Sequence, residues 1–398
     1  MTSASHRFGW YLALLQLFFT LCWTVYAIYL PKLAAAAGFA PGAVILLLMA
    51  DQVIFTICDF ATGVAADKVT RVLGRLGSWV AIATALSCIA FLALPFVAVG
   101  GPLVFLAFTL VWTITSSALR APPRMLLGKY AAKPSIPYLS SLAMLGYGIA
   151  GALGPYLAIT LRDVDPRWPF ALSSIALVLT TFGMISAERR LAAGKKAQAV
   201  SPRAFGSFTK AAAVFALGMI VLALGYQIHF ALESAPLFLR FASPGELQWL
   251  MPVFWIGFNI AMFPASFVTQ RFGGYAVMGA AGIIGALAIA ATYLAQGLQG
   301  LVIAQFIVGV AWGAILMSAF TVAFAIGENG GEGRMSGLLF SALALATFAR
   351  MTIVAAGLGT DANLRGAIQW LPTLCWALAG AGLLYLAVAG VRRLIAKC

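Results

Sequence analysis

The chain is dominated by long, continuous runs of apolar residues, and this feature restricts it to folds that cross a membrane. Apolar residues make up 63% of the sequence and charged residues only 9%, whereas about 25% of the residues in a soluble domain are charged. A helix needs about 20 apolar residues to cross the hydrocarbon layer, and barrel strands would show short alternating segments instead. The sequence therefore predicts an all-α membrane protein.

Twelve transmembrane helices are predicted, one for each long apolar run. They cover residues 8–30, 41–66, 76–97, 101–119, 135–160, 168–187, 210–239, 246–269, 275–295, 299–327, 335–358 and 366–390. The one long polar connection, 188–209, is rich in Arg and Lys and is expected to be a cytoplasmic linker. It divides the chain into an N-terminal six-helix bundle, 1–187, and a C-terminal six-helix bundle, 210–398.

Basic residues are concentrated on one side of the predicted membrane. Of the 25 Lys and Arg residues, 19 lie on the side that holds both termini and five lie on the other. Because Lys and Arg collect in cytoplasmic loops, both termini are predicted to be cytoplasmic. The same distribution explains the net charge of +14 without a nucleic-acid partner. We expect a monomeric, multi-pass protein of the lipid bilayer of a plasma membrane, the bacterial inner membrane.

No residue pattern typical of catalysis is present. Gly146, Gly148 and Gly151 match a dinucleotide-binding pattern, but they lie inside an apolar span, where small residues favour close helix packing. His229 and Glu233 share a helix face, yet the chain contains only two His residues and offers no third ligand nearby. We therefore expect no enzymatic activity, no cofactor and no metal site.

Two short turns in the sequence are similar to each other. Residues 63–71 follow the second span, and residues 266–274 follow the eighth, 203 positions later. The second copy keeps a basic residue, Arg271, but has Gln270 where the first has Asp67. Because the offset is about half of the 398 residues, the chain is predicted to consist of two related halves. Repeated apolar halves are typical of secondary transporters.

Together these features resemble the major facilitator superfamily of transporters, over essentially the whole chain. Members carry the signature G-x-x-x-D-[RK]-x-G-[RK]-[RK] between their second and third helices. Gly63, Asp67, Lys68 and Arg71 match it, whereas Thr70 stands in place of the second Gly. The resemblance implies a secondary active transporter of a small molecule, and it says little about the substrate.

The resemblance also implies a role for Asp67. In family members this acid faces the N-terminus of the eleventh helix, whose partial positive charge favours an anion. Asp67, with Asp59 two turns deeper, would then hold the cytoplasmic side shut while the outer side is open. The alternative is that Asp67 only caps a turn and balances Lys68 and Arg71.

Ionisable residues inside the spans are few, and their cost in a membrane marks them as candidates for function. Asp51 in the second span and Arg350 in the eleventh lie roughly 15 and 12 Å from the outer surface, at 1.5 Å per residue. The resemblance implies that these helices pack together, so we expect an ion pair that opens and closes with the outer side. Alternatively, the pair is permanent, or Arg350 stays unpaired and binds an anionic substrate.

The resemblance implies that the first, fourth, seventh and tenth helices line a central cavity. The residues expected there are Trp23, Tyr26, Trp112, Thr115, Ser116, Tyr226, Gln227, Phe230 and Trp312. Aromatic side chains with a few polar tips suit an amphipathic organic solute. They also suit ordinary packing between helices.

Proton coupling requires a group that gains and loses a proton near neutral pH, and Asp51, Glu233 and His229 are the candidates. Residues 151–155 are similar to a glycine-proline motif of the family's antiporters. We therefore expect a proton-coupled antiporter that exports a small organic solute. The alternatives are proton-coupled uptake of an organic anion, and a membrane receptor or assembly factor that transports nothing.

Overall fold

The computed structural model describes residues 3–69, 76–120, 136–193, 209–328, 330–359, 361 and 363–395. Within these ranges it contains helices and no strand. The first part comprises α1 (Ser3–Ala36), α2 (Ala43–Val69), α3 (Leu76–Val97), η1 (Ala98–Gly100), α4 (Pro102–Ala118), α6 (Ile136–Thr160) and α7 (Arg167–Ala193). The second comprises α8 (Lys210–Ile228), η3 (His229–Glu233), α9 (Ser234–Phe238), η4 (Pro244–Glu246), α10 (Leu247–Leu250), α11 (Pro252–Phe272), α12 (Gly274–Leu294), α13 (Leu298–Ile326), α14 (Glu332–Ala355) and α15 (Arg365–Ile395).

Ten helical stretches among the described residues are long and apolar enough to cross a membrane. The apolar helix α4 has 17 residues and is shorter than these, and α7 is not among the ten. Large apolar side chains remain exposed on the surface, as at Leu103 and Leu378, where lipid can cover them. The chain is therefore a multi-pass membrane protein.

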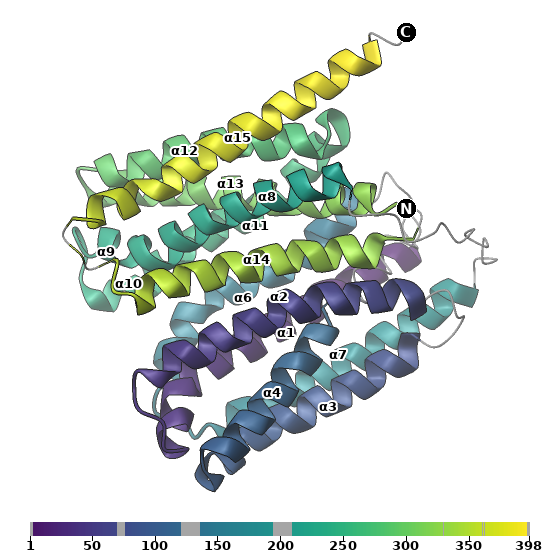
Figure 1. Cartoon of the computed structure of the whole chain (residues 1–398), viewed down its shortest axis with the longest axis vertical. Helices are drawn as coiled ribbons and strands as arrows, with labels where there is room; N and C mark the ends of the chain where they lie inside the picture. Colours follow the sequence, from purple (N-terminus) through teal and green to yellow (C-terminus); the bar gives the residue numbers. More distant parts are fainter. Residues whose placement is uncertain are drawn as a thin grey trace.

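The helices lie in two groups (Figure 1). Helices α1 to α7 form one group, and helices α8 to α15 form the other. Between the groups, α2 packs along α14, and α6 packs along α11 and α13. Both chain ends lie on the same side of the molecule, which we call the terminal face, and the other side is the opposite face.

The contact between α2 and α14 depends on glycine. Gly63 of α2 lies directly against the backbone of Gly333 in α14. Nearer the opposite face, the Ser341 hydroxyl donates to the carbonyl oxygen of Thr56 at 2.7 Å. These pairs show that the two helices run antiparallel, in a register that places residue 63 beside residue 333.

The glycine series in α6 packs against two neighbouring helices. Gly146 lies against the carbonyl group of Ala13 in α1, and Gly151 lies against the indole ring of Trp255 in α11. The predicted role of these glycines in close helix packing is confirmed.

Several element boundaries differ from the sequence-based expectation; α1, for example, covers Ser3–Ala36 where 8–30 was expected. Helix α7 continues to Ala193, so the first part of the expected linker 188–209 is helical, and residues 194–208 lie outside the described ranges. The expected span 210–239 is interrupted by η3, a single turn of π-helix. Such turns occur frequently at functional sites.

Candidate functional site

A cavity of about 300 Å³ lies between the two groups of helices. Helices α1, α2, α3, α4, α6 and α7 line it from one group, and α8, α13 and α14 line it from the other. Most of the lining is aromatic or aliphatic, with a small number of polar side chains. This size and composition are typical of a site for a small organic molecule.

Six of the residues that the sequence placed at the cavity line it. They are Trp23, Trp112, Ser116, Tyr226, Gln227 and Trp312. Each group of helices contributes a stacked aromatic pair: the ring centroids of Trp23 and Trp112 are 6.1 Å apart, and those of Tyr226 and Trp312 are 4.4 Å apart. The cavity therefore has an aromatic wall on both sides.

Three expected lining residues are directed elsewhere. Tyr26 is fully buried, and its hydroxyl donates to the carboxylate of Asp51 at 2.9 Å. The Thr115 hydroxyl donates to a carbonyl in its own helix at 2.7 Å. Phe230 packs on Phe254, with ring centroids 4.6 Å apart. The spacing of these residues predicted which helix carries each of them, but not the rotation of that helix about its axis.

The cavity also contains polar residues that the sequence-based prediction missed. They come mainly from helices outside the expected set of four, and include Gln16, Thr20, Gln52, Ser87, Arg120, Tyr147 and Thr347. Apart from Arg120, the signal for each is a polar residue in an apolar span, which by itself does not distinguish a cavity residue from a residue in a contact between helices.

The charged residues at the cavity are basic. Arg120 and Arg350 line it, and no Asp or Glu does so among the described residues. The Nε atom of Arg350 is buried without a hydrogen-bond partner, as are the indole Nε1 of Trp312 and the hydroxyl of Ser87. Arg120 is paired with the Asp59 carboxylate, so Arg350 supplies the positive charge at this space that no carboxylate of the described residues balances.

Asp51 and Arg350 do not form the expected ion pair in this conformation. The Asp51 carboxylate accepts hydrogen bonds from Tyr26 at 2.9 Å and from Thr113 at 2.7 Å. The register of α2 against α14 places Arg350 level with residues 46–47, so it lies about 7 Å, or roughly one and a quarter helical turns, nearer the opposite face than Asp51. The depths of Asp51 and Arg350 were estimated from the ends of the predicted spans, and that estimate was not precise enough to predict a contact between them.

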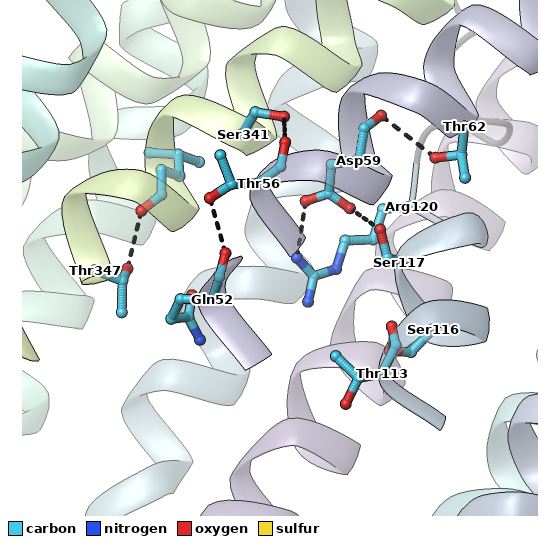
Figure 2. Close-up of polar contacts among 11 residues, drawn as sticks. Gln52, Thr56, Asp59, Thr62, Thr113, Ser116, Ser117, Arg120, Ser341 and Thr347 are labelled. Atoms are coloured by element: carbon cyan, nitrogen blue, oxygen red, sulfur yellow. Dashed lines mark hydrogen bonds and ion pairs between the residues drawn. The ribbon is translucent and has the colours of Figure 1, made fainter. Parts of the chain in front are cut away.

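Arg120, which counted as a loop charge in the sequence, instead reaches Asp59. Its guanidinium Nη1 lies 3.1 Å from the Asp59 carboxylate, and its Cζ lies 3.8 Å from the centroid of the Phe55 ring. The Ser117 hydroxyl donates to the same carboxylate, so Asp59 is held from two positions near the end of α4 (Figure 2). Arg120 follows α4 by two residues, which lets its long side chain turn back along the helix.

Asp67 joins the two groups of helices at the terminal face. Its carboxylate accepts from the backbone N–H of Gly333 at 2.7 Å and from that of Arg334 at 2.8 Å. Both N–H groups belong to the first turn of α14, whose own N-cap, Gly331, supplies no side-chain hydrogen bond. The predicted contact between Asp67 and this helix N-terminus is confirmed.

The other residues of the repeated turns are less informative. Lys68 is exposed at the end of α2, and Arg71 lies outside the described residues. Arg271 is in the last turn of α11, with its guanidinium 5.4 Å from the centroid of the Phe272 ring.

His229 and Glu233 lie at the two ends of η3, away from the cavity lining. His229 is fully buried, with Nε2 3.2 Å from the Gln305 side-chain oxygen. The Gln305 amide donates in turn to Ser234 at 3.1 Å. Among the described residues no group of three His, Cys, Asp or Glu side chains is placed to hold a metal ion.

No protein-family model and no curated protein matches the chain by sequence. Solved structures do match in fold. The human organic anion transporter MFSD10 (TETRAN) has a TM-score of 0.71 at 16% identity, over 97% of this chain and 99% of that one. The proton:xylose symporter XylE, of the major facilitator superfamily, has a TM-score of 0.71 at 14% identity, over 95% and 94%. A bacterial homologue of the iron transporter ferroportin, in an outward-facing state, has a TM-score of 0.71 at 13% identity, over 96% and 99%. The chain therefore has the fold of the major facilitator superfamily transporters.

Proposed function

We propose that the chain is a secondary active transporter that moves a small organic solute through the central cavity by alternating access. One observation carries this proposal: the cavity lies between the two groups of helices, and Asp67 joins those groups at the terminal face. Two rigid halves that rock about such a site can open it to one side of a membrane and then to the other.

The proposed architecture is two six-helix bundles, 1–187 and 210–398, joined by the linker 188–209. Helices α4 and α7 would complete the twelve spans, since α4 packs on α3 and α7 packs on α1 and α3. Helices α2 and α11 end at Val69 and Phe272, which are 203 residues apart, the same separation as the two repeated turns. This correspondence supports an origin by duplication.

We place the terminal face in the cytoplasm of a bacterial cell, because the sequence predicts most Lys and Arg residues on the side of the two termini. Asp67, Gly63 and Asp59 would then act as a cytoplasmic latch with the basic residues Lys68, Arg71 and Arg271. The conformation described above would be the one closed to the cytoplasm. The outward-facing state of the similar ferroportin homologue is consistent with this assignment.

For proton coupling we favour Asp51. Its carboxylate is buried and accepts from two hydroxyl groups, with no cation in hydrogen-bond range among the described residues. Glu233 and His229 remain candidates, although they lie in η3 and away from the cavity lining.

We favour proton antiport, and thus export, because residues 151–155 are similar to the antiporter motif. A second candidate is proton-coupled uptake of an organic anion, which Arg350 at the cavity supports. The two predict opposite responses to a pH jump across sealed vesicles. Accumulation of solute driven by acid inside supports antiport, and accumulation driven by acid outside supports symport.

Flux in proteoliposomes tests transport itself. Compounds that raise the melting temperature of the purified protein would be offered in labelled form to vesicles that contain the wild type, Trp112→Ala or Trp168→Phe. We expect saturable flux that Trp112→Ala removes and Trp168→Phe keeps, since Trp168 is exposed at the start of α7. Binding without flux for every such compound would favour a receptor or assembly factor instead.

A further inference from the structure

We infer that the cavity selects organic acids: the acidic group binds between Arg350 and Trp312, and a flat aromatic body lies against the Trp23–Trp112 pair. This inference rests on the proposed function, and it names the chemical class of the solute.

The indole N–H of Trp312 is a donor with no acceptor. Trp312 is fully buried at the centre of α13, lines the cavity and stacks on Tyr226, yet its Nε1 has no hydrogen-bond partner among the described residues. In contrast, the buried Trp376 of α15 donates its indole N–H to the carbonyl of Leu222 at 2.7 Å. A buried donor without an acceptor costs free energy, so the Trp312 N–H is suited to an acceptor that arrives with a ligand.

Arg350 supplies the charge beside this donor. Its Nε is also buried without a partner, and Arg350 lines the same cavity as Trp312 and Tyr226, the residue on which Trp312 stacks. Asp51, the acid once expected to pair with Arg350, already accepts from Tyr26 and Thr113. The guanidinium presents planar, paired donors that match a carboxylate.

The rest of the lining indicates what the acidic group is attached to. On the side formed by the first group of helices, Trp23 and Trp112 stack with an angle of 12° between their ring planes. The ring centroid of Phe55 lies 5.4 Å from that of Trp23. These surfaces suit a planar aromatic body. Ser87 of α3 adds a buried hydroxyl without a partner to the lining, and a second polar group on the solute could bond to it.

The charge of the lining residues favours an acidic solute over a cationic or a neutral one. The two charged residues that line the cavity within the described part are both Arg, and no carboxylate lines it there. Arg120 is already paired with Asp59, so the charge that faces a ligand without a partner is that of Arg350. A cation would therefore meet repulsion, and a neutral solute would leave the Arg350 charge without compensation.

The test uses matched sets of compounds that share a shape and differ in charge. Binding of 2-naphthoate, 2-naphthamide and 2-naphthylmethylamine to the full-length protein in detergent would be measured by calorimetry, together with the same three forms of benzene and indole compounds. We expect the acids to bind at least about tenfold more tightly than the amides and amines, because hydrogen bonds to charged groups are the strong ones. Arg350→Gln should remove this preference, because it weakens the binding of the acids far more than that of the amides. Trp312→Phe, which keeps the ring and removes the donor, should weaken acid binding by about tenfold.

Two matched controls lie outside the cavity. Arg162→Gln and Trp168→Phe change exposed residues of the same types and should leave all affinities unchanged. The inference is overturned if no acid of the set binds, if amides or amines bind as tightly as the acids, or if Arg350→Gln keeps the preference for acids. An acid that binds as expected but does not cross vesicles would support this site and reject transport. Flux of neutral or cationic solutes alone would support transport and reject the proposed acid-binding site.

Discussion

At the scale of single residues, α2 and α14 can pack closely because residue 63 is a glycine and has no side chain. A Cβ at Gly63 would overlap the carbonyl group of Gly333, which is backbone and cannot rotate away. We expect Gly63→Ala to lower the stability of the protein by about 1–3 kcal/mol through overpacking, measured as a lower melting temperature. Gly300→Ala is the matched control, because nothing lies within 4 Å of the Cβ that it would add. Equal melting temperatures for the two variants would show that the helices can separate locally without cost.

Asp67 permits a second test at this scale. Asp67→Asn removes the charge that strengthens its two hydrogen bonds to the first turn of α14, so the terminal face should open more often. In a cysteine-free background, Ser336→Cys reports this opening, because Ser336 is fully buried in that turn. We expect alkylation of this cysteine to be about five- to tenfold faster with Asp67→Asn, the equivalent of about 1–1.4 kcal/mol.

The control for this measurement is Asp361→Asn, since Asp361 accepts from Asn363 in an exposed turn after α14. An alkylation rate that does not change with Asp67→Asn would mean that the glycine contact alone closes this face.

At the scale of elements, the π-helix η3 is stabilised by a buried polar network. Gln305 bonds both His229 and Ser234, and the Ser234 hydroxyl donates to the His229 carbonyl at 3.0 Å. Gln305→Leu leaves two buried polar groups without this partner, at a cost of about 1–3 kcal/mol each. We expect a clear fall in melting temperature, whereas Gln299→Leu, at an exposed position of the same helix, should have little effect. A fall of similar size in both variants would contradict a specific role for the network.

The sequence predicted the approximate position of the long helices better than their ends and internal irregularities. Long apolar runs located α2, α13 and α14 to within a few residues, because the thickness of a bilayer sets the length of a span. The π-helix was not predictable, since its backbone pattern depends on Gln305, a partner 76 positions after His229. The end of α7 was placed too early because its last turns are polar.

The candidate site was predicted only in part, because residue type and spacing do not show how each helix is rotated or which side chains meet. Trp23, Trp112 and Trp312 were correctly placed at the cavity, because large amphipathic side chains in a transporter fold mark it well. Tyr26 was placed there wrongly, since a rotation of α1 directs its hydroxyl to Asp51. Arg120 was missed because a basic residue at the end of a span usually belongs to the loop.

At the scale of the whole molecule, the distribution of charge predicts how the chain is oriented in the membrane. The excess of Lys and Arg on the terminal face predicts that both chain ends stay in the cytoplasm. A green fluorescent protein fused after the last residue should therefore fluoresce in bacterial cells, and an alkaline phosphatase fused there should be inactive. The reversed result would invert the latch, because Asp67 would then close the periplasmic side.

In the proposed transport cycle, the hydrogen bonds that Asp67 makes to α14 have a consequence for the rate of turnover. When the two halves separate there, the amides of Gly333 and Arg334 lose their acceptor and must be hydrated. Each opening at this end therefore takes up water, and each closing releases it. Sucrose and similar osmolytes, which are excluded from protein surfaces, would oppose that uptake. Turnover should consequently slow under osmotic stress even when the solute gradient is held constant.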